Sequence, residues 1–344
     1  MHMADALISP AVGGTMWAAT AGLIAYSAKK LKEEADERKV SLMGVLGAFI
    51  FASQMINFSI PATGSSGHLG GGMILAILLG PYAAFLVMAS VLIVQALFFA
   101  DGGLLALGCN IFNMGFFPCF VVYPLVYRKI AGSASTQKKI MFGSLAAAII
   151  GLQLGAFGVV IETVFSGISE LPFRTFVLLM QPIHLAIGIV EGLVTAAVVT
   201  FVWNARPEIL NAAEHSVPIG IVNIKKVLLG LVLAAAVAGG ALSWFASSNP
   251  DGLEWAMFKA SGKEELESHK TVHVSLAAIQ EKTAFLPDYG FKKDESETEP
   301  EASAGTSWPA VDSGTSVSGL AGGGLTLFMS ILIGLGLKRR KNAA

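Results

Sequence analysis

The first residues of the chain and one distant histidine are of the types that form a small metal site. The sequence opens with Met1 and His2, and a second histidine, His68, lies in the glycine-rich stretch GSSGHLGGG. A free α-amine, the His2 backbone nitrogen and the His2 imidazole can enclose one small cation in fused chelate rings. One in-plane position then remains for an imidazole such as that of His68. We therefore predict a metal site with Met1, His2 and His68 as its ligands.

This set of nitrogen donors restricts the metal. Nickel(II), copper(II) and low-spin cobalt(II) accept tetragonal nitrogen ligation. A deprotonated amide also removes one charge from the dication, which lowers the cost of moving it into an apolar bundle. No basic segment and no small-residue cleavage site precede Pro10, so we expect the amino terminus to persist in the mature protein.

Each of these histidines also has a structural interpretation. His2 alone could be a mobile terminal residue, and His68 alone could be a loop histidine bonded to a carbonyl. Asn57 and His184 are possible second-shell groups, although His184 and Glu191 are more typical of hydrogen bonds between helices. External His269 and His273 could share a helical face, and we expect that pair to be solvated. Asp5 could anchor the amino-terminal segment or be solvated.

The composition predicts an all-α polytopic membrane protein. Apolar residues make up 54% of the 344 residues and only 14% are charged, and the apolar residues come in blocks long enough to span a bilayer. We expect the lipid bilayer as a partner and no nucleic acid. The apolar runs are Ala11 to Ala28, Ser41 to Phe58, Leu69 to Gly80, Tyr82 to Ala100, Leu104 to Tyr127, Ile140 to Val164, Phe173 to Trp203, Val227 to Ser247 and Leu320 to Leu337.

Basic residues indicate the orientation of these runs. Four clusters, near residues 29–39, 128–139, 206–226 and 338–341, should all be cytoplasmic. Nine crossings satisfy every cluster, provided that Gly80-Pro81 is a turn between two segments. The amino terminus, the His68 loop and the Asp101-Gly102-Gly103 turn are then external, and the carboxyl terminus is cytoplasmic. In this scheme His2 and His68 share one side of the membrane, which favours the metal interpretation of both.

The chain divides into two predicted units. Residues 1–218 form a seven-helix bundle, and residues 219–344 form a two-helix hairpin with a long external segment at 248–319. Within that segment, Asn249 or Asp251 could cap a short amphipathic helix that packs on the membrane surface or on the first unit. The sequence beyond Lys293 has almost nothing to bury and is expected to be disordered.

The motifs of common enzymes are absent from the sequence. There is no GxxxxGKS nucleotide loop, no HExxH and no nucleophile elbow, so we expect a protein that is not an enzyme and that depends on another protein to drive uphill transport. Small residues four apart allow close helix contacts, for which internal packing is the expected use. They are Ala18/Gly22, Ala21/Ala25 and Gly44/Ala48.

Three segments together resemble the CbiM/NikM family, the substrate-binding components of energy-coupling-factor importers for cobalt and nickel. They read MHMADALISP, NFSIPATGSSGHLGGG and LLGPYAAFLVMASVLIVQALFFADGGLLALGCNIFNMG. A further segment, NPDGLEW, resembles the two-helix CbiN/NikN component. Relatives often read MHIPDG or MHIMEG at the start, whereas this chain has Met3, Ala4 and Ala6, and its SGHL loop is more similar to nickel-type members.

The resemblance implies a transported metal rather than a cofactor. It implies square-planar binding of nickel or cobalt by Met1, His2 and His68, a transmembrane coupling (T) component and paired ATPases as partners, and a place in a prokaryotic cell membrane. Two other functions are compatible with the residues. An organic vitamin carrier would need a larger cavity with aromatic and hydrogen-bonding walls, and a membrane metal sensor would use the external segment as its responsive domain.

Overall fold

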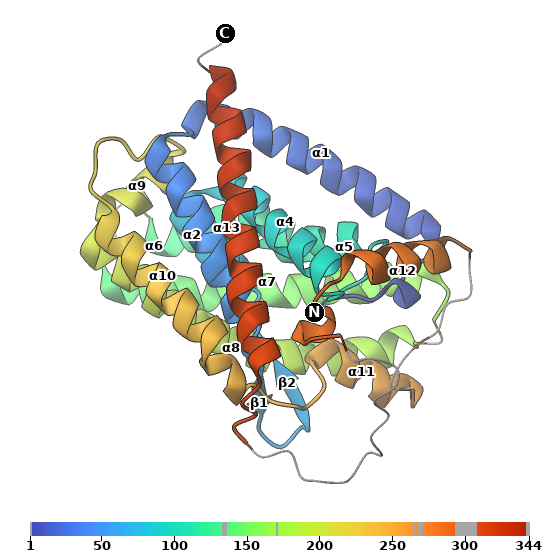
Figure 1. Ribbon diagram of the computed structural model, residues 1–344. Coiled ribbons are helices and arrows are strands. Elements are labelled where there is room, and N and C mark those ends of the chain that lie inside the picture. Colours follow the sequence, from blue (N-terminus) through green and yellow to red (C-terminus); the bar gives the residue numbers. More distant parts are fainter. Residues whose placement is uncertain are drawn as a thin grey trace.

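Helices account for almost all of the regular structure (Figure 1). The structure is a computed structural model that describes residues 2–132, 136–169, 171–263, 266, 271–292 and 308–341. Five helices in this part of the chain are long and apolar enough to cross a membrane. The predicted all-α, polytopic membrane class is therefore confirmed. The five are Pro81–Phe98, Leu107–Ala131, Gln137–Ser166, Phe173–Ala205 and Ser313–Lys338.

The first unit begins with helices whose ends follow local sequence signals. Ser9 caps α1 by accepting a hydrogen bond from the Val12 N–H, and Pro10 fills the first helical position. The elements in chain order are η1 Asp5–Leu7, α1 Pro10–Glu34, α2 Glu37–Gln54, β1 Phe58–Ile60, β2 Ser65–Gly67, α3 Gly72–Leu79, α4 Pro81–Phe98, α5 Leu107–Ile111, η2 Phe112–Tyr127, α6 Arg128–Ala131, α7 Gln137–Ser166, α8 Phe173–Ala205 and α9 Pro207–His215.

The second unit consists of two long helices and the segment between them. Its elements are α10 Lys225–Gly240, η3 Leu242–Phe245, α11 Gly252–Ser261, α12 Thr271–Thr283, η4 Pro287–Tyr289 and α13 Ser313–Lys341. Helices α10 and α13 pack against α2 of the first unit. A side chain at Gly44 of α2 would come within 2.6 Å of Ile331 on α13, so the two units share one packed interior. The predicted disorder after Lys293 concerns residues 293–307, which lie outside the described residues.

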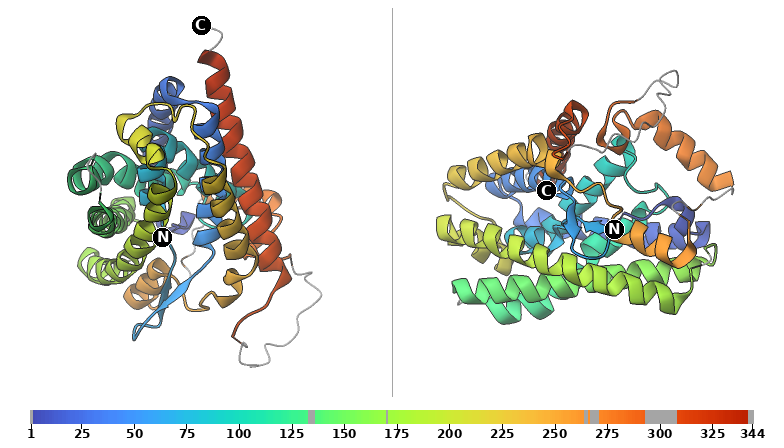
Figure 2. Two further views of the ribbon diagram at one scale, coloured as in Figure 1. Left: turned by 90° about the vertical axis from the view of Figure 1, so that its left-hand side faces the viewer. Right: turned by 90° about the horizontal axis from the view of Figure 1, so that it is seen from below.

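Figure 2 shows where the long helices and the β1–β2 hairpin lie in the molecule. Helices α7 and α8 run side by side along one edge of the molecule, while the β1–β2 hairpin and α11 lie at one end of the bundle. The segment that contains α11 therefore folds onto the end where the His68 loop follows β2. The domain limits of 218 and 219 stay a prediction.

The number of crossings is not settled by helix length. The chain does break at the predicted position, because Gly80 has a φ of 81° and separates α3 from α4. However, α3 has eight residues, about 12 Å of helix at 1.5 Å per residue, which is too short to span a hydrocarbon core. The nine-crossing scheme and the orientation of the termini remain predictions.

The small-residue pairs differ from one helix to another. Gly44 packs internally against α13, as expected. The expectation was wrong for α1, where Ala18, Ala21, Gly22 and Ala25 are exposed and a side chain at Gly22 would meet nothing within 4 Å. The physical reason is the position of α1 at the outside of the bundle (Figure 1), with one face against α4 and α5 and the other uncovered.

Candidate metal centre

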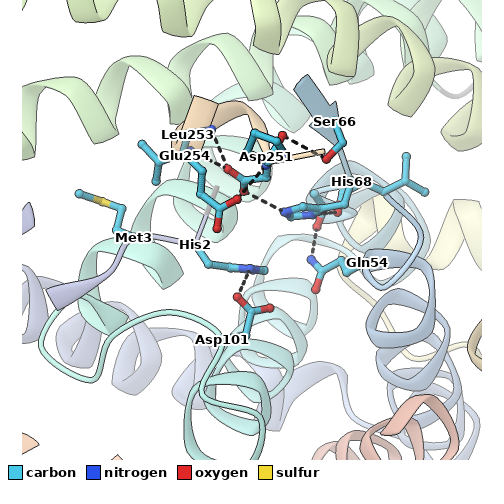
Figure 3. A network of polar contacts seen from close by, with 12 residues as sticks. His2, Met3, Gln54, Ser66, His68, Asp101, Asp251, Leu253 and Glu254 are labelled. Carbon is cyan, nitrogen blue, oxygen red and sulfur yellow. Dashed lines mark hydrogen bonds and ion pairs between the residues drawn. The ribbon is translucent and has the colours of Figure 1, made fainter. Parts of the chain in front are cut away.

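The two histidines singled out in the sequence lie against each other. The His2 and His68 rings are stacked, with 5.1 Å between their centroids and 17° between their planes. Both side chains are largely buried, at 7% and 9% exposed. Figure 3 shows them projecting toward one another from different parts of the chain. Met1, the third predicted ligand, lies outside the described residues.

The His2 imidazole is oriented by one carboxylate. Its Nδ1 atom lies 2.9 Å from Oδ1 of Asp101, while its Nε2 atom is buried with no hydrogen-bond partner among the described residues. A buried polar nitrogen without a partner is costly and calls for an explanation, such as a missing ligand. Asp101 itself lies in the Asp101-Gly102-Gly103 turn that was predicted to be external.

Backbone contacts hold the amino-terminal segment in place. Asn110 accepts a hydrogen bond from the Met3 N–H at 2.8 Å and donates one to the Met3 carbonyl at 3.2 Å. The Gly103 N–H donates to the same carbonyl at 2.9 Å. Asp5 accepts from the Ala106 N–H at 2.9 Å, so it anchors the segment, which was one of its two expected roles. Because these contacts mostly use backbone groups, changes at residues 3, 4 and 6 leave them intact.

A buried carboxylate fixes the backbone of the His68 loop. Glu191 of α8 accepts hydrogen bonds from the N–H groups of Gly70 and Gly71, at 2.7 and 3.1 Å. Gln54 donates to the Gly70 carbonyl at 2.9 Å. Gly71 has a φ of 77°, a conformation that favours glycine. Glu191 therefore acts through the loop backbone, rather than through the hydrogen bond between helices that the sequence favoured.

Removal of the Glu191 carboxylate should loosen the loop that carries His68 without changing the His68 side chain itself. We expect Glu191→Ala to weaken nickel and cobalt binding by about 10- to 100-fold, the usual cost of losing a group that orients a metal ligand. Equilibrium dialysis of the purified variant against each metal measures the change. Glu162→Gln is the matched control, because Glu162 is another buried carboxylate but bonds Asn113 instead. Equal losses in both variants would contradict the orienting role of Glu191.

A turn from the second unit covers the His68 loop. The Ser66 N–H donates to the Pro250 carbonyl at 2.8 Å, and the Ser66 hydroxyl donates to the Asn249 carbonyl at 2.8 Å. Asp251, one of the two caps that the sequence left open, caps α11 within a complete capping box with Glu254. Helix α11 packs on α8, so it docks on the first unit, which was one of the two expected surfaces.

Asp251, the capping residue, also lies beside His68. Oδ1 of Asp251 accepts from two N–H groups of α11, and Oδ2 lies 3.8 Å from Nε2 of His68. The next residue, Gly252, approaches α8 closely, because a side chain there would come within 2.6 Å of Ile183 and 3.3 Å of His184. The sequence indicated that Asp251 could cap a helix but not that it lies beside His68, although residues 250–254 (PDGLE) carried the resemblance to the CbiN/NikN component.

Burial and charge keep these groups in states suited to a cation. Burial, above all, lowers the pKa of His68 from 6.5 to about 3, because a charged imidazole would lose its hydration. Burial opposes ionisation of Asp101, but the charge of His2 and the hydrogen bonds from His2 and Tyr289 exceed that effect and lower its pKa to about 2. At neutral pH, His68 is neutral and Asp101 is an anion.

The remaining candidates have different roles. His184 lines a cavity of about 10 Å³ together with His68 and Asp251, and its Nδ1 bonds the Met180 carbonyl of its own helix at 2.7 Å. The Asn57 carbonyl accepts from the Ser247 N–H at 2.7 Å, so Asn57 ties the hairpin to the second unit.

The expectation of a solvated His273 was wrong. The side chain is 4% exposed and its Nε2 lies 2.9 Å from the Ile8 carbonyl, because α12 folds back over the amino-terminal segment. His269 lies outside the described residues.

Comparison with known proteins supports a transport role. A fused nickel transport protein, NikMN, provisionally so named in Archaeoglobus fulgidus, is 37% identical over 217 residues, which are 61% of this chain and 68% of that protein. The fused nickel transport protein NikMN of Rhodobacter capsulatus is 33% identical over 232 residues, 61% of this chain and 64% of that protein. A crystal structure of a truncated transition metal transporter aligns with a TM-score of 0.53 and 31% identity, covering 60% of this chain and 99% of that one.

Family models match both units of the chain. The PDGLE domain matches residues 225–339, and the CbiM model matches residues 2–209. The relatives are named as transport proteins rather than enzymes, in agreement with the sequence prediction. The chain is therefore a member of the CbiM family, the cobalt uptake substrate-specific transmembrane region, fused to a PDGLE domain.

Proposed function

We propose that this protein is the substrate-binding and translocating subunit of an energy-coupling-factor importer for nickel or cobalt. The metal is held by the amino-terminal amine, by the backbone and imidazole nitrogens of His2 and by the imidazole of His68. The observation that carries the proposal is the buried stack of His2 on His68, which brings two imidazoles together beside the amino-terminal segment. Donors of this kind suit a square-planar ion.

The contacts of His2 describe how the metal-free site would accept an ion. Chelation by the His2 amide and imidazole uses Nδ1, because only that ring nitrogen closes a small ring with the amide. Nδ1 is bonded to Asp101 in the structure, so the metal replaces that contact. The amine and the amide release their protons to water as their nitrogens bind the cation.

The size of the cavity separates this proposal from a vitamin carrier. The space beside His68 is about 10 Å³, enough for about one water molecule or ion. Pockets for drug-sized organic ligands are usually about 300 Å³ or larger. The cavity is lined by glycines, by the imidazoles of His68 and His184, by Asp251 and by aliphatic side chains, without a Phe, Tyr or Trp among the lining residues.

The energy for uptake would come from partners. We propose a transmembrane T component and paired ATPases, since the sequence has no nucleotide-binding loop of its own. The uncovered small-residue face of α1, at Ala18, Ala21, Gly22 and Ala25, supports docking of another membrane helix there. The amino terminus would lie outside the cell and the carboxyl terminus in the cytoplasm.

The test is metal retention by the protein with an unmodified amino terminus. We expect it to bind a stoichiometric amount of nickel or cobalt at pH 7.5 and to release it as the pH falls below about 6. Protons compete with the cation for its nitrogen donors as the pH falls. Elemental analysis after gel filtration at each pH measures retention, and retention that does not change with pH would contradict nitrogen ligation.

A further inference from the structure

The PDGLE turn places one carboxylate oxygen beside the candidate metal ligand His68. Asp251 comes from the second unit, and its side chain is 17% exposed. Its position is well defined, because Oδ1 accepts from the Leu253 and Glu254 N–H groups at 2.8 and 2.9 Å. The Pro250 carbonyl just before it is tied to Ser66. Groups held by a helix cap and a backbone bond make precise ligands.

The distance from this oxygen to the imidazole is too long for a hydrogen bond, but it is close to the spacing of two ligands of one metal ion. Oδ2 lies 3.8 Å from Nε2 of His68, beyond hydrogen-bond range. Two donors at right angles on one ion, each with a bond of about 2 Å, lie about 3 Å apart. A shift of less than about 1 Å would therefore bring Oδ2 to the axial position of a metal bound to His68.

Axial oxygen ligation distinguishes the two candidate metals. A square-planar nickel(II) ion has a filled orbital pointing along the axis and gains little from a fifth donor. Low-spin cobalt(II) has a single electron in that orbital and accepts one axial ligand. Carboxylate oxygen is also a harder donor than imidazole, and hard donors help ions earlier in the divalent series than nickel.

We propose that Asp251 is an axial oxygen ligand for the transported ion and that it favours cobalt over nickel. This inference rests on the proposed function, because it requires a metal on the His2 and His68 nitrogens. It assigns the fused PDGLE domain a direct role in metal choice. A preference for cobalt would differ from the nickel-type appearance of the SGHL loop. The two can differ because the residue proposed to select the metal lies outside that loop, 183 positions after His68.

The test compares variants that keep the helix cap. Asn and Ser cap helices about as well as Asp, so Asp251→Asn and Asp251→Ser remove the charged oxygen donor and preserve α11. We expect each variant to bind cobalt about tenfold more weakly, with nickel affinity changed by less than about twofold. Competition of each metal against a coloured chelator, with the full chain in detergent, measures both affinities.

A matched control removes a charge from the same turn. Glu254→Gln keeps the capping box and leaves the Asp251 carboxylate in place, so we expect both affinities to stay within about twofold of the parent chain. The electron paramagnetic resonance spectrum of the cobalt-loaded protein should change from a five-coordinate to a four-coordinate form in Asp251→Asn only. A purely structural role would leave that spectrum unchanged.

The outcomes are separable. Equal loss of cobalt and nickel binding in both Asp251 variants, or an unchanged ratio of the two affinities, would overturn the axial assignment. Failure of the parent chain to hold either metal would instead overturn the proposed function.

Discussion

A chain extended by one residue before Met1 should lose nickel and cobalt binding by roughly a thousandfold or more, equivalent to about 4 kcal/mol of binding free energy. The extension converts the Met1 amine into a peptide nitrogen and moves the free amine one residue away from His2. The new amine, two amide nitrogens and the His2 imidazole could then enclose an ion without His68, but only if the added residue entered the packed site, which the contacts of Met3 and Asp5 oppose. Titration of the purified, extended chain with each metal, monitored by the absorption of the metal complex, measures the loss.

The structure leaves the segment no freedom to compensate by sliding. The backbone of Met3 is held on both sides by Asn110, and Asp5 is bonded to Ala106. A side chain at Gly103 would lie 1.9 Å from the Asp5 carboxylate, so the turn and the segment are in close contact. A shift by one residue would break all of these contacts together.

A substitution within the same segment provides the control. Ala4 is exposed, so Ala4→Gln should change metal affinity by less than about twofold, the usual small effect of a surface substitution. If the extended chain and Ala4→Gln bind metal equally well, the amine is not a ligand. The site would then hold an ion through side chains alone, or an organic ligand.

Two kinds of feature could be predicted from the sequence: those that depend on a short stretch of residues, and those that follow from the placement of charges along the chain. Asp251 caps α11 because a capping residue, a glycine and a glutamate follow one another locally. His2 and His68 could be paired because charge placement put both on one side of the membrane. Their stacking agrees with that reasoning.

The parts that were missed depend on contacts between distant segments. No local pattern states that Asp251 faces His68 or that Asp101 orients His2. The first pair is joined by the packing of the two units, and the second by the folding of distant segments within the first unit. His273 was expected to be solvated for the same reason, since its own sequence neighbourhood is polar. Helix length was a further source of ambiguity, because α3 is too short for the crossing that the charge pattern assigns to it.

Replacement of His68 by alanine should abolish high-affinity binding of both metals. The variant loses one of four nitrogen donors and leaves a void beside His2, with which His68 is stacked. We expect affinity to fall by at least about a hundredfold, measured by equilibrium dialysis. His184→Ala is the matched control, because His184 lines the same cavity but bonds its own helix, and its loss should cost less than about tenfold.

Free imidazole distinguishes a ligand from a structural residue. The void in His68→Ala would have the shape of the missing ring, and it would lie beside the His2 ring on which His68 is stacked. Added imidazole should therefore restore metal binding to His68→Ala, because it supplies the fourth nitrogen donor without repairing the backbone of the loop. It should not restore binding to the chain extended before Met1, which retains His68 and lacks the amine in register. Rescue of both variants, or of neither, would contradict the assignment of His68 as the fourth ligand, since only a donor missing from that one position is replaced by the free ring.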